Sequence, residues 1–156
     1  MYRISIFTDM HMADELIVRR SIEINAPAKR IWDILTDPEH TVKYMFGCEV
    51  ISDWNIGSPL IWKGAADGVV YVKGNLIALD KEKLFSFTVF DPNAGIEDTP
   101  SNYTTVAIEL KPGNGSTALT VTQGDFAGVV DGQNRFLSTE AGWDSVLPRI
   151  KELAEM

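Results

Sequence analysis

The chain has 156 residues, 45% hydrophobic and 23% charged, a length and balance typical of a single folded domain rather than a disordered or membrane-spanning chain. Its formal net charge of −8 argues against a nucleic-acid partner, because the phosphate backbone requires a basic patch. Its single cysteine, Cys48, excludes an intrachain disulfide. Because only two histidines accompany that cysteine, we expect neither a metal nor another cofactor.

Residues 1–14 differ from the rest of the chain. Tyr2, Ile4 and Ile6 alternate with Arg3, Ser5 and Phe7 and then the pattern stops, so we expect an N-terminal arm that adds an edge strand or supports a homodimer. This end lacks the long apolar segment of a secretory signal, and we therefore expect a cytoplasmic protein. The remaining residues, 15–156, are expected to form one domain.

The domain begins with a strand and two short helices. Apolar and polar residues alternate from Leu16 to Asn25, which predicts a half-buried strand. Proline is favoured in the first turn of a helix and asparagine can cap its free amides, so Asn25 and Pro27 predict a helix start. Asp37-Pro38 should end this helix and begin a second one that runs to about Tyr44.

Six further strands are predicted at 48–53, 59–63, 69–79, 84–90, 103–111 and 117–123, separated by glycine-rich, proline-rich or charged turns. From Asp131 to Met156 the apolar residues recur at spacings of three, four and seven, as in an amphipathic helix: Phe136, Trp143, Val146, Leu147, Ile150 and Leu153. The expected fold class is α+β, with a curved antiparallel sheet of about seven strands wrapped around this C-terminal helix.

Four segments carry a family resemblance, namely Ile24 to Trp32, Leu35 to His40, Ser52 to Pro59 and Gly142 to Leu147. In this order and spacing the chain resembles the helix-grip fold of the START-like superfamily (SRPBCC), and more narrowly the family of activator of heat-shock protein 90 ATPase homologues. That resemblance implies a binder of hydrophobic ligands, related to polyketide cyclases and lipid-transfer domains. The family name comes from a co-chaperone with an additional N-terminal domain, so the name is not carried over as a function.

Aromatic residues are the main candidates for a ligand pocket between the sheet and the helix, because large rings suit a flat apolar ligand. They are Phe46, Trp54, Trp62, Tyr71, Phe87 and Trp143, and Leu147 is the helix position at which a larger side chain should fill the cavity. The alternative is that these side chains fill the space themselves as an ordinary core. Phe126, in the loop before the last helix, is a candidate lid residue together with Val129.

Polar candidates are fewer. Thr139 and Glu140 occupy helix positions that heptad spacing turns inward, which suits a polar ligand contact; alternatively this end of the helix extends into water. No nucleophile beside a base is evident. The first hypothesis is therefore binding of a small apolar or aromatic molecule. A cyclase or aromatase-type enzyme is the second, and a chaperone-accessory or stress-response module, which requires chaperone association, is the third.

Overall fold

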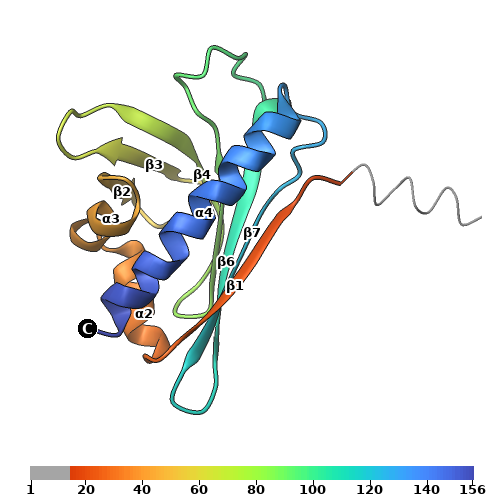
Figure 1. Cartoon of the computed structure of the whole chain (residues 1–156). Helices are drawn as coiled ribbons and strands as arrows, with labels where there is room; N and C mark the ends of the chain where they lie inside the picture. Colours follow the sequence, from red (N-terminus) through yellow and green to blue (C-terminus); the bar gives the residue numbers. More distant parts are fainter. Residues whose placement is uncertain (1–14) are drawn as a thin grey trace, which may run out of the picture.

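A seven-stranded antiparallel sheet in the order β1-β7-β6-β5-β4-β3-β2 curves around one long helix, α4 (Figure 1). The computed structural model describes residues 15–156. Its strands are β1 (Val18–Ile24), β2 (Cys48–Ser52), β3 (Pro59–Gly64), β4 (Val70–Asp80), β5 (Leu84–Val89), β6 (Thr104–Pro112) and β7 (Thr117–Gly124). Its helices are α2 (Ala28–Thr36), α3 (Pro38–Tyr44), the short 3-10 helix η1 (Pro100–Asn102) and α4 (Gly132–Ala154).

Period-two alternation places one face of each central strand in the core. Ile108 on β6 pairs with Val121 on β7, and both are buried. Register irregularities interrupt the β3–β4 pair after Trp62 and the β4–β5 pair after Leu76, and such bulges bend a sheet. Gly74, two residues before the second irregularity, allows a close approach to β5, because an added Cβ there would lie 1.7 Å from the carbonyl oxygen of Thr88. The sheet therefore has the curvature needed to enclose a helix.

Helix α4 lies diagonally across the concave face of the sheet (Figure 1). Its C-terminal half buries the apolar stripe, ending with Ile150 and Leu153. Arg30 of α2 holds this end by donating from Nε to the carbonyl oxygen of Ala154 at 2.9 Å and from Nη2 to that of Leu153 at 3.0 Å. These contacts suit a helix C-terminus, where free carbonyls carry partial negative charge.

The two short helices, α2 and α3, pack against each other and against α4. Asp37 caps α3 through a hydrogen bond from the Glu39 amide at 2.9 Å. The predicted capping of α2 by Asn25 is wrong, because Pro27 occupies the N-cap position without a side-chain hydrogen bond and Asn25 lies two residues before it. The backbone N–H of Asn25 donates to Glu155 Oε2 just after α4, so the end of α4 passes beside the β1–α2 turn.

The predicted strand and helix order, the antiparallel sheet and the helix-grip arrangement are confirmed. Element ends differ from the predicted ones by one or two residues, as expected for boundary assignments. The predicted N-terminal arm, residues 1–14, lies outside the described residues. Among the described helices, none combines the length and the apolar character that crossing a bilayer requires.

Candidate functional site

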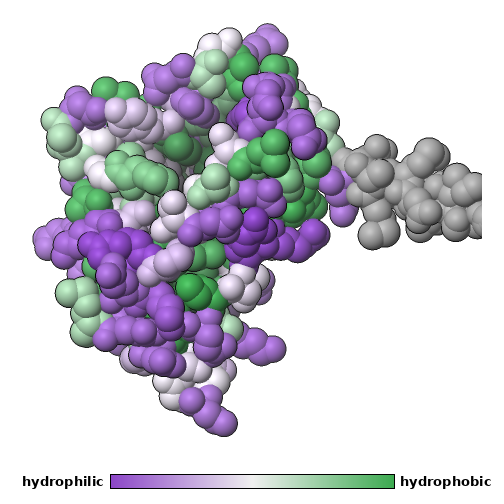
Figure 2. Space-filling view, viewed as in Figure 1, coloured by the Kyte–Doolittle hydropathy of each residue, from purple (hydrophilic) through white to green (hydrophobic). Residues whose placement is uncertain are grey.

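An apolar pocket of about 530 Å³ lies between the middle of α4 and the sheet. Its lining comes from α4, the sheet and the α3–β2 loop: Met45, Phe46, Cys48, Trp62, Tyr71, Val72, Phe87, Val89, Val106, Gln123, Thr139, Gly142, Trp143 and Val146. Figure 2 shows a recessed area of apolar surface on this face of the molecule. The site thus occupies the space that a helix-grip fold encloses between its two layers.

The helix wall of the pocket is one face of α4. Thr139, Gly142 and Val146 follow at spacings of three and four, which brings them onto the same side of a helix. Gly142 is the residue of this wall that has no side chain, and a Cβ built there meets no atom within 4 Å. The missing side chain at position 142 therefore leaves space open on the pocket face.

The sheet wall is made of aromatic and branched side chains. The ring centroids of Trp62 and Phe87 are 6.3 Å apart, and Val89 follows Phe87 on the same face of β5. Phe85, on that face too, stacks on Phe87 and meets Trp32 edge-on deeper in the core. The β5 face that carries Phe85 and Phe87 is therefore shared between the packed core and the pocket.

The mouth of the pocket carries two exposed aromatic residues. Phe46 is 72% exposed and has a φ of 50°, a left-handed conformation that costs a bulky residue roughly 1 kcal/mol or more. Tyr71 is 43% exposed, and its hydroxyl donates to Asp67 Oδ2. This hydrogen bond is the main reason why the pKa of Asp67 is lowered and that of Tyr71 is raised. The Tyr71 ring is thereby held in place at the rim.

Polar groups inside the pocket are few and mostly paired. Trp143 Nε1 donates to Gln123 Oε1 at 2.8 Å, and Gln123 Nε2 donates to Thr104 Oγ1 at 3.2 Å. The Cys48 thiol is buried, and burial, with a smaller contribution from the charge of Asp67, raises its pKa. Gln123 thus links α4 to the sheet at the polar end of an otherwise apolar wall.

The family model described as Activator of Hsp90 ATPase homolog 1-like protein matches residues 25–155. The chain belongs to this family. The solved structure of ChR145 from Cytophaga hutchinsonii has a similar fold: it is 31% identical to this chain, with a TM-score of 0.70, over 88% of this chain and 92% of that one. No curated protein matched the sequence.

Two other solved structures share the fold at lower identity. The Aha1 dimer from Colwellia psychrerythraea is 15% identical, with a TM-score of 0.69, over 90% of this chain and 96% of that one. CalU16 from Micromonospora echinospora is 16% identical, with a TM-score of 0.64, over 87% of this chain and 73% of that one. The helix-grip architecture is therefore shared by proteins of very different sequence.

Most of the residues that the sequence indicated as ligand contacts lie together in the structure of this chain. The pocket brings together Phe46, Trp62, Tyr71, Phe87, Thr139 and Trp143. Phe126 lines an adjoining chamber rather than the pocket, where it is buried and meets Phe136 edge-on. Its ring is part of the packed structure, and Val129 beside it is also buried.

Three of the indicated residues lie elsewhere. Trp54 faces a separate depression beside Trp32, because it follows β2 on the far side of Phe85. Leu147 is 4% exposed and belongs to the packed core. The inward orientation expected for Glu140 is not observed: its carboxylate accepts a hydrogen bond from Arg20 of β1 at 3.2 Å, on the outer flank of α4.

Sequence reasoning missed several lining residues, of which Gln123 and Gly142 matter most. Gln123 continues the inward series of Leu119 and Val121 on β7, so a polar residue in an inward strand position was the available signal. Gly142 lies inside the predicted helix, where a residue without a side chain was the available signal, and open space lies beside it. Among residues 15–156, no group of three or more His, Cys, Asp or Glu side chains is arranged to hold a metal.

Proposed function

We propose that this protein binds a small apolar or aromatic molecule in the pocket between α4 and the sheet. The observation that carries the proposal is an open pocket of about 530 Å³ with an aromatic wall and few polar groups. Its size lies within the range of about 300–1,000 Å³ that is usual for small-molecule sites. Affinity would come mainly from burial of apolar surface, at about 25 cal/mol per Å².

The titratable groups of the pocket favour binding over proton transfer. Cys48 and Tyr71 both have raised pKa values, so the thiol and the phenol remain neutral near pH 7. The Tyr71 hydroxyl is already committed to Asp67. A cyclase-type reaction would require a group that exchanges protons near neutral pH, and this pair is poorly suited to that role.

The first test is native mass spectrometry of the purified protein, combined with a thermal-shift screen of fatty acids, flavonoids and polyketide-like aromatic compounds. A ligand that binds only the folded state raises the melting temperature in a dose-dependent way. We expect at least one such compound. A bare mass together with no shift from any class of compound would contradict the proposal.

Gly142 allows the pocket to be filled without disturbing the core. In Gly142→Leu the new side chain enters open space on the pocket face, and replacing a helical glycine contributes about 0.5–1 kcal/mol to stability. We expect ligand affinity to fall at least about tenfold while the melting temperature of the free protein does not fall. Ala141→Leu, an exposed position one residue earlier, is the matched control and should bind normally. Equal affinities in both variants would place the ligand elsewhere.

A further inference from the structure

The pocket continues toward the N-terminal end of α4 as a second chamber of about 380 Å³. Val72, Val89, Gln123 and Thr139 line both spaces, so the two adjoin along α4. The second chamber is bounded by the loop after β5, which contributes Ala94 and Ile96, and by the first turns of α4. An elongated ligand in the main pocket can therefore extend into this chamber.

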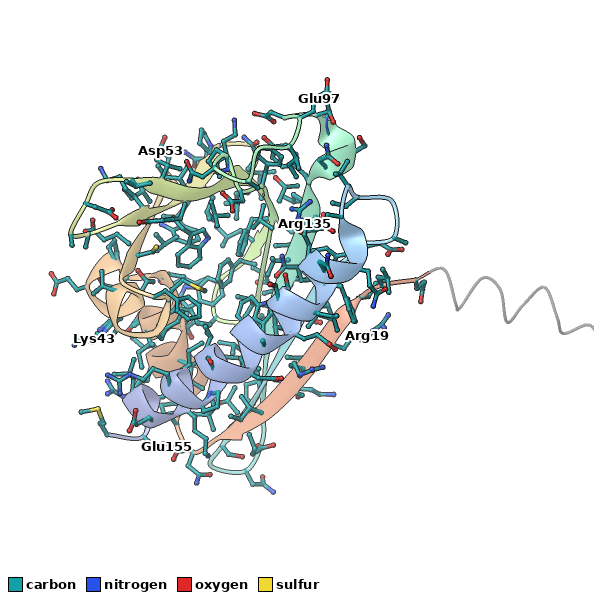
Figure 3. All side chains as sticks on the ribbon, turned by 45° about the horizontal axis from the view of Figure 1, so that its top comes forward. Arg19, Lys43, Asp53, Glu97, Arg135 and Glu155 are labelled. Carbon is teal, nitrogen blue, oxygen red and sulfur yellow. The ribbon has the colours of Figure 1, made fainter. Side chains whose placement is uncertain are left out.

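The second chamber contains a cationic side chain, Arg135, which the sequence did not single out. Figure 3 shows Arg135 near the N-terminal end of α4, in the region between the helix and the sheet. Its guanidinium is half-buried, and Nη1 donates one long hydrogen bond of 3.5 Å to the carbonyl oxygen of Asn102. Within residues 15–156, no carboxylate oxygen lies within 4.0 Å of it. A guanidinium has five N–H donors, so most of them remain available.

Among the described residues, Arg135 has no ion pair of the kind that Arg20 forms on the other side of α4. Arg20 forms ion pairs with Glu140 and Asp144, so its charge is balanced by the protein. Burial instead lowers the pKa of Arg135, and the charges of Asp91 and Asp131 oppose that shift only in part. A partly desolvated cation that no carboxylate pairs directly is costly unless an anion meets it.

Two carboxylates, Asp91 and Asp131, also line this chamber, and their arrangement matters for which charge it accepts. Both are exposed, and each already accepts a local hydrogen bond: Asp91 from the Asn93 amide at 2.8 Å and Asp131 from Asn134 Nδ2 at 2.9 Å. Each of these carboxylates therefore already has a donor within the protein. The guanidinium is the group in the chamber with the greatest unused hydrogen-bonding capacity.

We infer that Arg135 binds the carboxylate of an amphipathic ligand whose apolar body occupies the main pocket. The inference rests on the proposed function and specifies its ligand class as a carboxylic acid with an aliphatic or aromatic body. The planar fork of arginine matches a carboxylate with two parallel hydrogen bonds. The positive end of the α4 dipole lies in the same region and adds to the attraction. Arg135 is the one cationic side chain among the residues that line this chamber.

The test compares two probes that differ only in the head group, 6-phenylhexanoate and 6-phenylhexan-1-ol. Isothermal titration calorimetry at pH 7.5 measures both against wild type, Arg135→Met and Arg135→Lys. The matched control is Arg19→Met, which changes an exposed arginine of β1 (Figure 3). We expect wild type to bind the acid about 10- to 100-fold more tightly than the alcohol, as for hydrogen bonds to a charged group.

Arg135→Met should reduce acid affinity to that of the alcohol and leave alcohol affinity unchanged, which also shows that the variant is folded. Arg135→Lys keeps the charge but loses the fork, so it should retain part of the preference for the acid. Arg19→Met should match wild type. Equal affinity of wild type for acid and alcohol, or an equal loss of both in Arg135→Met, overturns the inference and leaves the proposed function standing. Failure of wild type to bind either probe counts against both.

Discussion

Thr41 of α3 supplies the hydrogen bonds that the open edge of the sheet lacks. Its side chain is fully buried; Oγ1 donates to the carbonyl oxygen of Cys48 at 3.0 Å and accepts from the amide of Val50 at 3.1 Å. Both partners belong to β2, the last strand of the sheet. An edge strand presents unpaired amides and carbonyls, and one hydroxyl here satisfies two of them away from water.

Replacing Thr41 with valine keeps the shape of the side chain and removes only the hydroxyl. Two buried backbone groups are then left without partners, and each costs about 1–3 kcal/mol, so we expect the free energy of unfolding to fall by about 2–6 kcal/mol. In a domain of this size that corresponds to a drop in melting temperature of roughly 4–24 °C. Thr41→Ser retains the hydroxyl and loses one methyl group, which should cost only about 1 kcal/mol.

Urea denaturation followed by tryptophan fluorescence measures these differences. Thr105→Val, at an exposed position of β6, is the control and should stay within about 0.5 kcal/mol of wild type. If Thr41→Val unfolds at the same urea concentration as the Thr105 control, the hydroxyl does not stabilise the β2 edge and the reasoning fails.

Two further predictions concern protonation. The hydrogen bond from Tyr71 is the main cause of the lowered pKa of Asp67; its stabilising effect is present above the unfolded pKa of about 4 and is lost as the pH falls through the lowered folded value. Tyr71→Phe should therefore raise the pKa of Asp67 in an NMR titration, and an unchanged value would show another cause. Burial raises the pKa of Tyr44, whose hydroxyl donates to the Leu35 carbonyl at 2.9 Å. Stability from that neutral phenol is complete below the unfolded pKa of about 10 and declines above it, so Tyr44→Phe should lose less stability than wild type between pH 8 and 11 in urea titrations; equal losses would contradict this.

The architecture could be predicted because each segment carries its own periodicity. Alternation in strands such as Thr117–Gly124 and three-and-four spacing in Gly132–Ala154 depend on backbone geometry alone. Turn residues then limited how the strands connect. The packing of an apolar sheet face against an apolar helix stripe follows from burial, with no need to know individual contacts.

The candidate site was harder to predict because periodicity assigns a side chain to a face but does not say what lies opposite. Thr139 and Glu140 are adjacent, and a rotation of about 100° between them separates the pocket from the outer flank. On that flank Glu140 pairs with Arg20, which lies 120 positions away in the sequence. Trp54 and Leu147 illustrate the same limit, since both are apolar positions that face other parts of the core.

The sequence by itself determined the family, the order of the elements and the sheet–helix layering, since these depend on local backbone preference and apolar patterning. Only the tertiary structure decided where packing stops. It showed that α4 fills the concave face along its C-terminal half and leaves space beside Gly142. It also brought Arg135 to the adjoining chamber without a carboxylate partner among the described residues. Those features depend on distances between segments far apart in the chain, which no local pattern encodes.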